Sequence, residues 1–184
     1  MKTLFSYGLT LEEAEELIKN GADVNEIYSK DENQTPLFFA KKIELMRLLI
    51  QHGANVNHQN HNKLTPASYT KDIEALQLFI DHGALLNIRD IYGATLLDHQ
   101  NGMYNLMFQD HIDNAKLLIA HGAIAGRIEG YQLFRELFTP EQQKAFDAFS
   151  SITNNDEDFF RMCLAYQESI KNHVKINIKD MDIL

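Results

Sequence analysis

One short turn is written four times along this 184-residue chain, as "NGADVN" at 20–25, "HGANVN" at 52–57, "HGALLN" at 82–87 and "HGAIAG" at 121–126. The glycines stand at positions 21, 53, 83 and 122, so successive turns are separated by 32, 30 and 39 residues. A period of this length is typical of arrays in which each repeat is one supersecondary unit stacked on its neighbours. The spacing therefore predicts a repeat protein.

An amphipathic helix precedes each turn. Apolar residues stand ten, seven, four and three positions before every glycine, and these offsets follow one face of a helix. The four sets are Leu11, Ala14, Leu17 and Ile18; Ile43, Met46, Leu49 and Ile50; Ile73, Leu76, Phe79 and Ile80; and Ile112, Ala115, Leu118 and Ile119. Helices commonly end in the left-handed region, where glycine avoids a Cβ penalty, so we expect each glycine to stop a helix. Thr10 and Glu13 are spaced as a capping box for the first of these helices.

A second signal follows the first three turns at ten to fifteen residues, as "QTPLFFA" at 34–40, "LTPASYT" at 64–70 and "ATLLDHQ" at 94–100. Threonine can cap a helix and proline is tolerated in its first turn, so Thr-Pro predicts a helix start. Each middle repeat is therefore predicted to run loop, helix, turn, helix and Gly-Ala.

With both signals in place, residues 1–126 resemble the ankyrin repeat family. The matching residues are Thr35-Pro36-Leu37 and Ala40 with Gly53-Ala54, Thr65-Pro66 with Gly83-Ala84, and Asp90, Gly93, Thr95 and Leu97 with Gly122-Ala123. The resemblance implies an all-α ankyrin-repeat solenoid of about four repeats, with projecting hairpin-like loops.

The repeats also depart from the family pattern. Thr35 precedes Gly53 by 18 residues, as Thr65 precedes Gly83, about three fewer than usual, which predicts clipped first helices. The fourth repeat is instead about nine residues longer and includes "GMYNLMFQD" at 102–110. We leave open whether this insert, Met103–Asp110, forms a hydrophobic contact surface or extends a helix. Phe38, Ser68 and Asp98 replace a histidine that makes an inter-repeat hydrogen bond in the family.

A helical cap is predicted for residues 127–184, because an array cannot leave the apolar face of its last repeat in water. "YQLFRELF" at 131–138 places Tyr131, Phe134, Leu137 and Phe138 on one helical face, and Thr139-Pro140 should start a helix running to about Ser150. "NNDED" at 154–158 should open a third helix with Phe159, Phe160, Cys163, Leu164 and Tyr166 in the core. The tail "VKINIKD" suggests an edge strand or an ordered arm.

Composition limits the kinds of partner and the cellular compartment that this chain is expected to have. The formal net charge of −9 argues against a nucleic-acid partner, because phosphates require a basic face. No apolar run approaches the roughly 18 residues that would predict a membrane span, and the start of the chain is too polar for a secretory signal. Cys163 is the single cysteine, which excludes an intrachain disulfide and suits a reducing compartment. We therefore expect a cytoplasmic protein.

Neither catalysis nor metal binding is predicted. His52, His82 and His121 each stand next to a helix-ending glycine, where an imidazole suits the negative end of the helix dipole. His58 and His61 share one loop without cysteines or a matching carboxylate pattern, and His99 and His111 are predicted to be isolated. The acidic run at 12–16 is interpreted as the solvated face of a helix. We expect no catalytic residues, no cofactor and no bound metal.

The family resemblance implies a non-enzymatic module that binds proteins through its loop tips and first helices. Matching the family's variable positions onto this sequence gives the candidate contact residues Asp31, Glu32, Gln34, Lys42, His61, Asn62, Leu64, Asp72, Ile91, Tyr92 and Ala94.

Two functions compete. One is a stoichiometric, immunity-type protein that blocks a partner such as a toxin, and the other is a scaffold, adaptor or host-directed effector. The compact chain, predicted as one domain without a linker, and the pI near 5.3 resemble those of small bacterial ankyrin proteins, some of which act as immunity proteins against toxins. This resemblance implies the first function, with a basic protein partner and a monomeric binder. An enzyme with an unrecognised site is a distant third.

Overall fold

The computed structural model describes residues 2–6, 8–28, 32–100 and 109–171. The chain divides into two compact units, Met1–Leu85 and Leu86–Leu184. Over the described residues every regular element is helical, which confirms the predicted all-α class.

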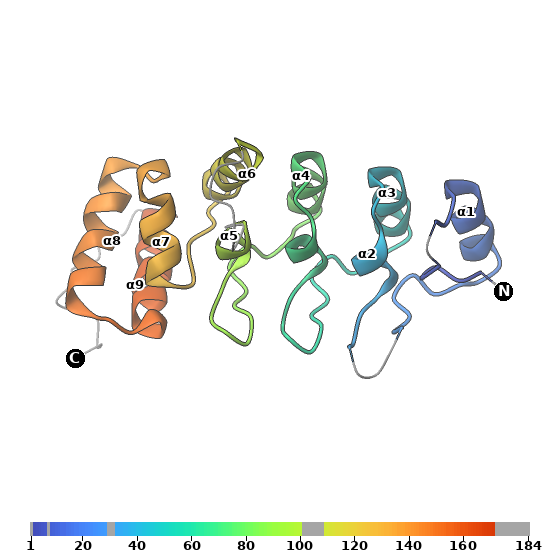
Figure 1. Ribbon diagram of the computed structural model, residues 1–184, viewed down its shortest axis with the longest axis horizontal. Helices are drawn as coiled ribbons and strands as arrows, with labels where there is room; N and C mark the ends of the chain where they lie inside the picture. The colour runs from blue at the N-terminus through green and yellow to red at the C-terminus, as the bar shows by residue number, and fades with distance from the viewer. Residues whose placement is uncertain (1, 7, 29–31, 101–108, 172–184) are drawn as a thin grey trace. The chain divides into compact units, whose positions relative to one another are not determined.

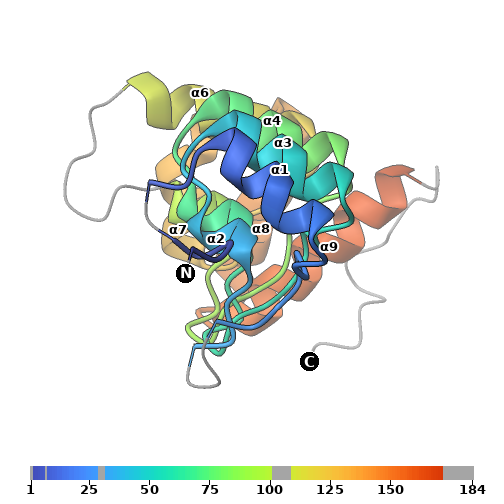
Figure 2. The same ribbon diagram turned by 90° about the vertical axis from the view of Figure 1, so that its right-hand side faces the viewer.

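Three long helices and two short ones make up the first compact unit. The long helices are α1 (Leu11–Lys19), α3 (Ile43–Gln51) and α4 (Ile73–Asp81), and the short ones are α2 (Pro36–Phe39) and the 3₁₀ helix η1 (Pro66–Tyr69). The long helices stand in a row, and the loops between the helix pairs project away from that row (Figures 1 and 2). Helix pairs and projecting loops are arranged as the sequence predicts.

Among its described residues, the second compact unit contains one further helix pair and a cap of three α-helices and one 3₁₀ helix. The pair is α5 (Leu96–His99) with α6 (Gln109–Ala120), and the cap contains α7 (Ile128–Phe134), the 3₁₀ helix η2 (Arg135–Leu137), α8 (Pro140–Ile152) and α9 (Asp156–Lys171). In Figure 1, α5 lies beneath α6, and α8 and α9 pack closely. The insert at 102–108 and the tail "VKINIKD" lie outside the described residues, whereas Gln109 and Asp110 open α6.

The repeated glycines end the helices as predicted. Gly21, Gly53, Gly83 and Gly122 have φ values of +91°, +87°, +79° and +87°. At the end of α3, the Gly53 amide donates to the Ile50 carbonyl and the Ala54 amide to the Leu49 carbonyl, both at 2.9 Å. The left-handed residue thus turns the chain out of the helix while its last carbonyls stay bonded.

The first helices are clipped, also as predicted. Each of α2, η1 and α5 is four residues long. Thr35 and Thr65 precede the proline at a helix start, yet neither side chain accepts a capping hydrogen bond, contrary to the role expected for threonine there. Capping does occur at Thr10 and Thr139, which both form the reciprocal capping box.

Asparagine side chains link successive Gly-Ala turns. Asn25 donates to the Gly53 carbonyl at 2.9 Å and accepts from the Asn55 amide at 2.8 Å. Asn57 bridges Gly83 and Leu85 in the same way, and Asn87 bridges Gly122 and Ile124 in the second compact unit. The three asparagines form a ladder that satisfies a backbone donor and acceptor at each step.

Apolar side chains fill the space under the helices. Leu49, Leu76 and Phe79 are at most 1% exposed in the first compact unit. In the cap, an aromatic cluster contains Tyr131, Phe138, Phe146, Phe149 and Phe159, each at most 3% exposed. Phe160 and Cys163 are also buried, as predicted, whereas Leu164 and Tyr166 are half-buried. The predicted cap helix starting at Thr139-Pro140 is confirmed and ends at Ile152, two residues beyond Ser150.

Candidate protein-binding surface

The third hairpin loop, residues 58–64, is organised by Asn60. Its backbone amide donates to the Leu64 carbonyl at 3.0 Å, and its side-chain oxygen accepts from the amides of Asn62 and Leu64, each at 3.0 Å. Lys63 closes the turn with φ of +59° and donates its amide to the Asn60 carbonyl at 2.9 Å. One buried side chain therefore holds the whole tip.

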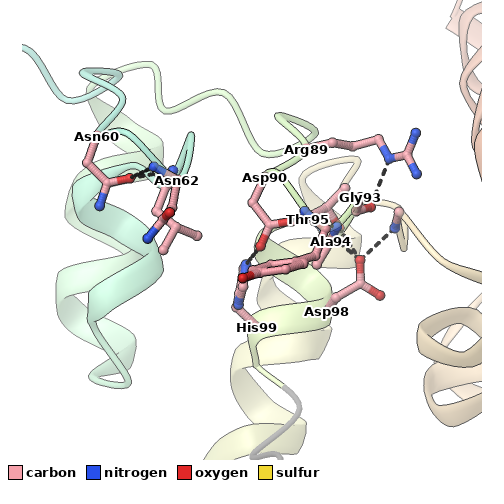
Figure 3. A network of polar contacts seen from close by, with 12 residues as sticks. Asn60, Asn62, Arg89, Asp90, Gly93, Ala94, Thr95, Asp98 and His99 are labelled. Atoms are coloured by element: carbon pink, nitrogen blue, oxygen red, sulfur yellow. Dashed lines mark hydrogen bonds and ion pairs between the residues drawn. The ribbon is translucent and has the colours of Figure 1, made fainter. Parts of the chain in front are cut away.

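The fourth hairpin loop, residues 88–94, repeats this frame with Asp90 in place of asparagine. The Asp90 amide donates to the Ala94 carbonyl at 2.9 Å, and Oδ1 accepts from the Tyr92 and Ala94 amides at 2.8 and 2.9 Å. Gly93 occupies the left-handed position with φ of +80°. Figure 3 shows Asn60 and Asp90 each turned toward the loop that it organises.

Different side chains stand on these equivalent frames. His61 and Asn62 are exposed at the third tip, whereas Ile91 and Tyr92 are 49% and 77% exposed at the fourth. Tyrosine offers a large amphipathic surface with few rotatable bonds, which makes it a frequent anchor at protein interfaces. Tyr92 is thus the most prominent contact group on either tip.

Arg89 fastens the fourth hairpin loop to the cap. Its Nε donates to the Gly93 carbonyl at 2.8 Å, Nη1 pairs with Glu157 of α9, and the guanidinium carbon lies 4.9 Å from the centre of the Phe160 ring. These contacts, made within the second compact unit, combine a hydrogen bond, an ion pair and a cation–π contact. The Tyr92 tip is therefore braced from both ends.

Asp98 lies beneath this loop, at the position where the family has histidine. Its Oδ2 accepts from the Thr95 amide at 2.7 Å, the Thr95 hydroxyl at 3.0 Å and the Gly126 amide at 2.7 Å. The Thr95 hydroxyl is also within 2.7 Å of the Ile124 carbonyl. Burial raises the pKa of the Asp98 carboxyl, and these hydrogen bonds offset part of that rise. An aspartate here supplies the link to the following turn.

The structure places most predicted contact residues at the surface. Leu64 is half-buried, Asp31 lies outside the described residues, and the exposed ones are Glu32, Lys42, His61, Asn62, Asp72, Ile91 and Tyr92. Asp72 also has a structural role, because its Oδ1 caps α4 by accepting from the Ala75 amide at 2.9 Å.

Gln34 and Ala94 are corrections to the predicted surface. They are 8% and 4% exposed, so neither can supply much contact area. Gln34 turns inward because its amide donates to the Tyr69 hydroxyl at 3.3 Å, and Ala94 is enclosed because it closes the Asp90 frame. Matching the family's variable positions to this sequence predicted exposure from position alone, whereas the hydrogen bonds of these loops turn two of those residues toward the interior.

Sequence reasoning missed two exposed tyrosines. Tyr69 is 44% exposed, and its hydroxyl accepts from Asn60 at 2.9 Å. Tyr28 is 60% exposed and packs its ring 5.1 Å from that of Phe5 and 5.3 Å from that of Phe39. Tyr69 ends a clipped helix, and this position was the signal that could have identified it.

Several histidine side chains have partners within the structure. Nδ1 of His82 lies 2.8 Å from the Leu78 carbonyl, and Nδ1 of His121 lies 2.9 Å from that of Leu117, which supports the helix-end interpretation. His58 contacts the Asn33 carbonyl at 3.0 Å. The prediction that His99 is isolated was wrong, because its Nε2 lies 3.0 Å from Asp90 Oδ2.

The described residues contain neither a metal site nor a membrane-spanning helix. No group of three or more His, Cys, Asp or Glu residues that could hold a metal occurs among the described residues. Over the same part of the chain, no helix has the length and apolar character needed to cross a bilayer.

Comparison with known proteins agrees with this architecture. Residues 6–90 match a family model described as ankyrin repeats in three copies. No curated protein matches the chain. Ankyrin repeats are protein–protein interaction modules, and the exposed tips just described are surfaces suited to such contacts.

Proposed function

We propose, from the premise that this chain belongs to the ankyrin repeat family through residues 6–90, that it is an immunity-type protein that blocks a partner by stoichiometric binding. The observation that carries the proposal is the pair of rigid hairpin frames, which present His61 and Asn62 on one tip and Ile91 and Tyr92 on the next.

A preformed tip favours tight binding. Ordering a flexible loop at an interface costs about 0.5–1.5 kcal/mol for each immobilised side chain, in addition to backbone entropy. The side chains of Asn60 and Asp90 already fix their loops by accepting two hydrogen bonds each from backbone amides, and Arg89 fixes the fourth hairpin loop to α9. Much of this ordering is therefore complete before the partner arrives, as a neutralising protein requires.

Charge favours a basic partner. The chain carries 26 acidic against 17 basic side chains. Of the acidic residues of α1, Glu12, Glu15 and Glu16 are exposed, whereas Glu13 pairs with Lys2 at 2.5 Å. An acidic surface raises the association rate of a basic protein and orients its approach. We propose that the chain acts as a monomer in the cytoplasm, where its single cysteine stays reduced.

The proposal is tested by affinity capture of the tagged chain from its native host, with mass spectrometry of the retained proteins. We expect one basic protein, whose activity falls to zero at a one-to-one molar ratio when the pure components are mixed. Several unrelated partners, or retention without loss of activity, would contradict neutralisation and support a scaffold.

Substitution of Tyr92 then locates the contact. Tyr92→Ala should weaken binding by about 2 kcal/mol or more, roughly 30-fold, because a central aromatic anchor is lost. Its stability should change little, because the ring is 77% exposed. The matched control is Ile152→Ala, which removes a 54% exposed side chain from the end of α8. Equal affinity of the two variants would exclude the fourth tip as the contact.

A further inference from the structure

The first Gly-Ala turn differs from the other three at the residue before its glycine. Asn20 stands there, whereas His52, His82 and His121 occupy the equivalent positions. Asn20 follows the last residue of α1 and is exposed, and its carboxamide makes no hydrogen bond to the described residues. Among the four turns, the first is therefore the one that pairs an unrestrained asparagine side chain with a following glycine.

An asparagine followed by glycine is able to cyclise. The Gly21 nitrogen attacks Cγ of Asn20, and the new bond closes a five-membered succinimide ring while the side-chain nitrogen leaves as ammonia with the proton of the Gly21 amide. Water then opens the ring at one of its two carbonyls, which leaves aspartate or isoaspartate at position 20. No group is oxidised or reduced, and water is the co-reactant. Glycine has no side chain to crowd this attack, and a Cβ built at Gly21 meets no atom within 4 Å, so the surroundings are open as well.

The folded turn restrains this reaction. The ψ angle of Asn20 is 10°, which places the Gly21 nitrogen close to the plane of the Asn20 nitrogen and away from Cβ. Ring closure requires the Gly21 nitrogen to lie near the plane of Cβ, so the bond between Cα and the carbonyl carbon of Asn20 has to rotate. That rotation breaks the 2.9 Å hydrogen bond from the Gly21 amide to the Ile18 carbonyl and the 3.0 Å bond from the Ala22 amide to the Leu17 carbonyl. The rate of the reaction is therefore set by how often the end of α1 opens.

Either product weakens this helix end. Aspartate adds a negative charge at the negative end of the helix dipole, on a helix where Glu12, Glu15 and Glu16 are already exposed. Isoaspartate lengthens the main chain by one atom, which displaces the Gly21 and Ala22 amides from the carbonyls that they bond in the folded turn. Because α1 stands at one end of the row of long helices and packs on α3 (Figure 1), this single change alters the edge of the first compact unit.

We propose that Asn20 is a modification site, which deamidates spontaneously through a succinimide whenever α1 opens, and whose products loosen α1 from the first compact unit. Water supplies the new oxygen and ammonia carries away the nitrogen, so the reaction proceeds in the pure protein. The modification concerns α1 and its turn alone, and it does not rest on the proposed neutralising function.

The test follows the pure full-length chain by peptide mapping and mass spectrometry during incubation at mildly alkaline pH. The parent protein carries Asn101→Gln, because Asn101-Gly102 is the other Asn-Gly pair of the sequence and lies outside the described residues. We expect aspartate and isoaspartate to accumulate at position 20, about ten to a hundred times more slowly in the folded chain than in denaturing urea. Equal rates in the two conditions would overturn the proposal. It would also be overturned if Asn20 stayed intact in the folded chain after several hundred of the half-lives measured in urea.

Two capping-box variants test the link to helix opening. Thr10→Ala removes the capping box at the start of α1, where the Thr10 hydroxyl accepts from the Glu13 amide at 3.2 Å, and should raise the deamidation rate of Asn20 about fivefold. Thr139→Ala is the matched control, because it removes the capping box of α8 in the other compact unit and should leave the rate unchanged. Equal rates in these two variants would overturn the dependence on opening of α1.

The stability of the product tests the loosening of α1. Asn20→His copies the other three turns and removes the reactive amide, so it serves as the unreactive control. After equal incubation, the deamidated chain should unfold at a lower urea concentration than it did before incubation, whereas Asn20→His should not change. An unchanged unfolding midpoint for the fully deamidated chain would overturn the proposed loosening. Because no host partner is used, failure here leaves the Tyr92 test unaffected.

Discussion

Gly53 provides a direct test of how the repeats stop their helices. Its φ is +87°, and a Cβ built at this residue meets no atom within 4 Å. Any loss of stability on substitution therefore comes from the backbone conformation and not from a steric clash with neighbours.

The magnitudes follow from the conformational preferences of each side chain. An L-residue held in the left-handed region costs about 1–2 kcal/mol, and a β-branched one up to about 3 kcal/mol. Alanine recovers about 0.4–1 kcal/mol by restricting the unfolded chain, and asparagine tolerates the left-handed region better than other residues. We expect Gly53→Val to lower the free energy of unfolding by about 1–3 kcal/mol, Gly53→Ala by about 0.5–1.5, and Gly53→Asn by less than about 1.

The assay is urea unfolding followed by far-ultraviolet circular dichroism at constant pH and salt. The same three substitutions at Gln51 serve as controls, because Gln51 is exposed and helical, two residues before Gly53. There valine and asparagine should cost no more than about 0.7 kcal/mol, the range of helix propensity. If Gly53→Val costs no more than Gln51→Val, the left-handed helix stop does not carry the stability assigned to it.

Two further substitutions test the polar framework. Asn57→Ala removes the hydrogen bonds to Gly83 and Leu85 and should lower the free energy of unfolding by about 1–3 kcal/mol. The control Asn62→Ala, at an exposed loop tip, should lower it by less than about 0.5 kcal/mol. Equal melting temperatures of the two variants would show that the asparagine ladder does not stabilise the fold. Because burial raises the pKa of Asp98, its ionised form lowers the stability of the folded state at neutral pH. The protein should therefore gain stability relative to Asp98→Asn as the pH falls through the raised folded-state pKa toward the unfolded value of 3.8. A difference in unfolding free energy between the two proteins that stays constant with pH would contradict this.

The sequence was sufficient to predict the features that depend on local spacing. The helix-ending glycines, the clipped first helices and the Thr139 cap each follow from residues close together in the chain, and their propensities are local. The Asp90 frame was within reach for the same reason, because Asp90 bonds to amides two and four residues ahead.

Features that join distant residues could not be predicted in this way. The bond from Asn25 to Gly53 spans 28 residues, and the contact between Arg89 and Glu157 spans 68. The orientation of Gln34 depends on Tyr69 in the next repeat, so the position of Gln34 within its own repeat could not show that the side chain is buried.

The burial of Cys163 makes the alkylation rate of its thiol a measure of how often the cap opens. The thiol is 1% exposed, and burial raises its pKa, so the thiolate that alkylating reagents require scarcely forms while the cap is closed. With one cysteine in the chain, the alkylation rate reports transient opening of the second compact unit without any added label. Arg89 contacts α9 at Glu157 and Phe160, so a partner bound to the fourth hairpin loop would slow the alkylation of Cys163. The reactivity of a buried thiol would then report whether the surface loop is occupied.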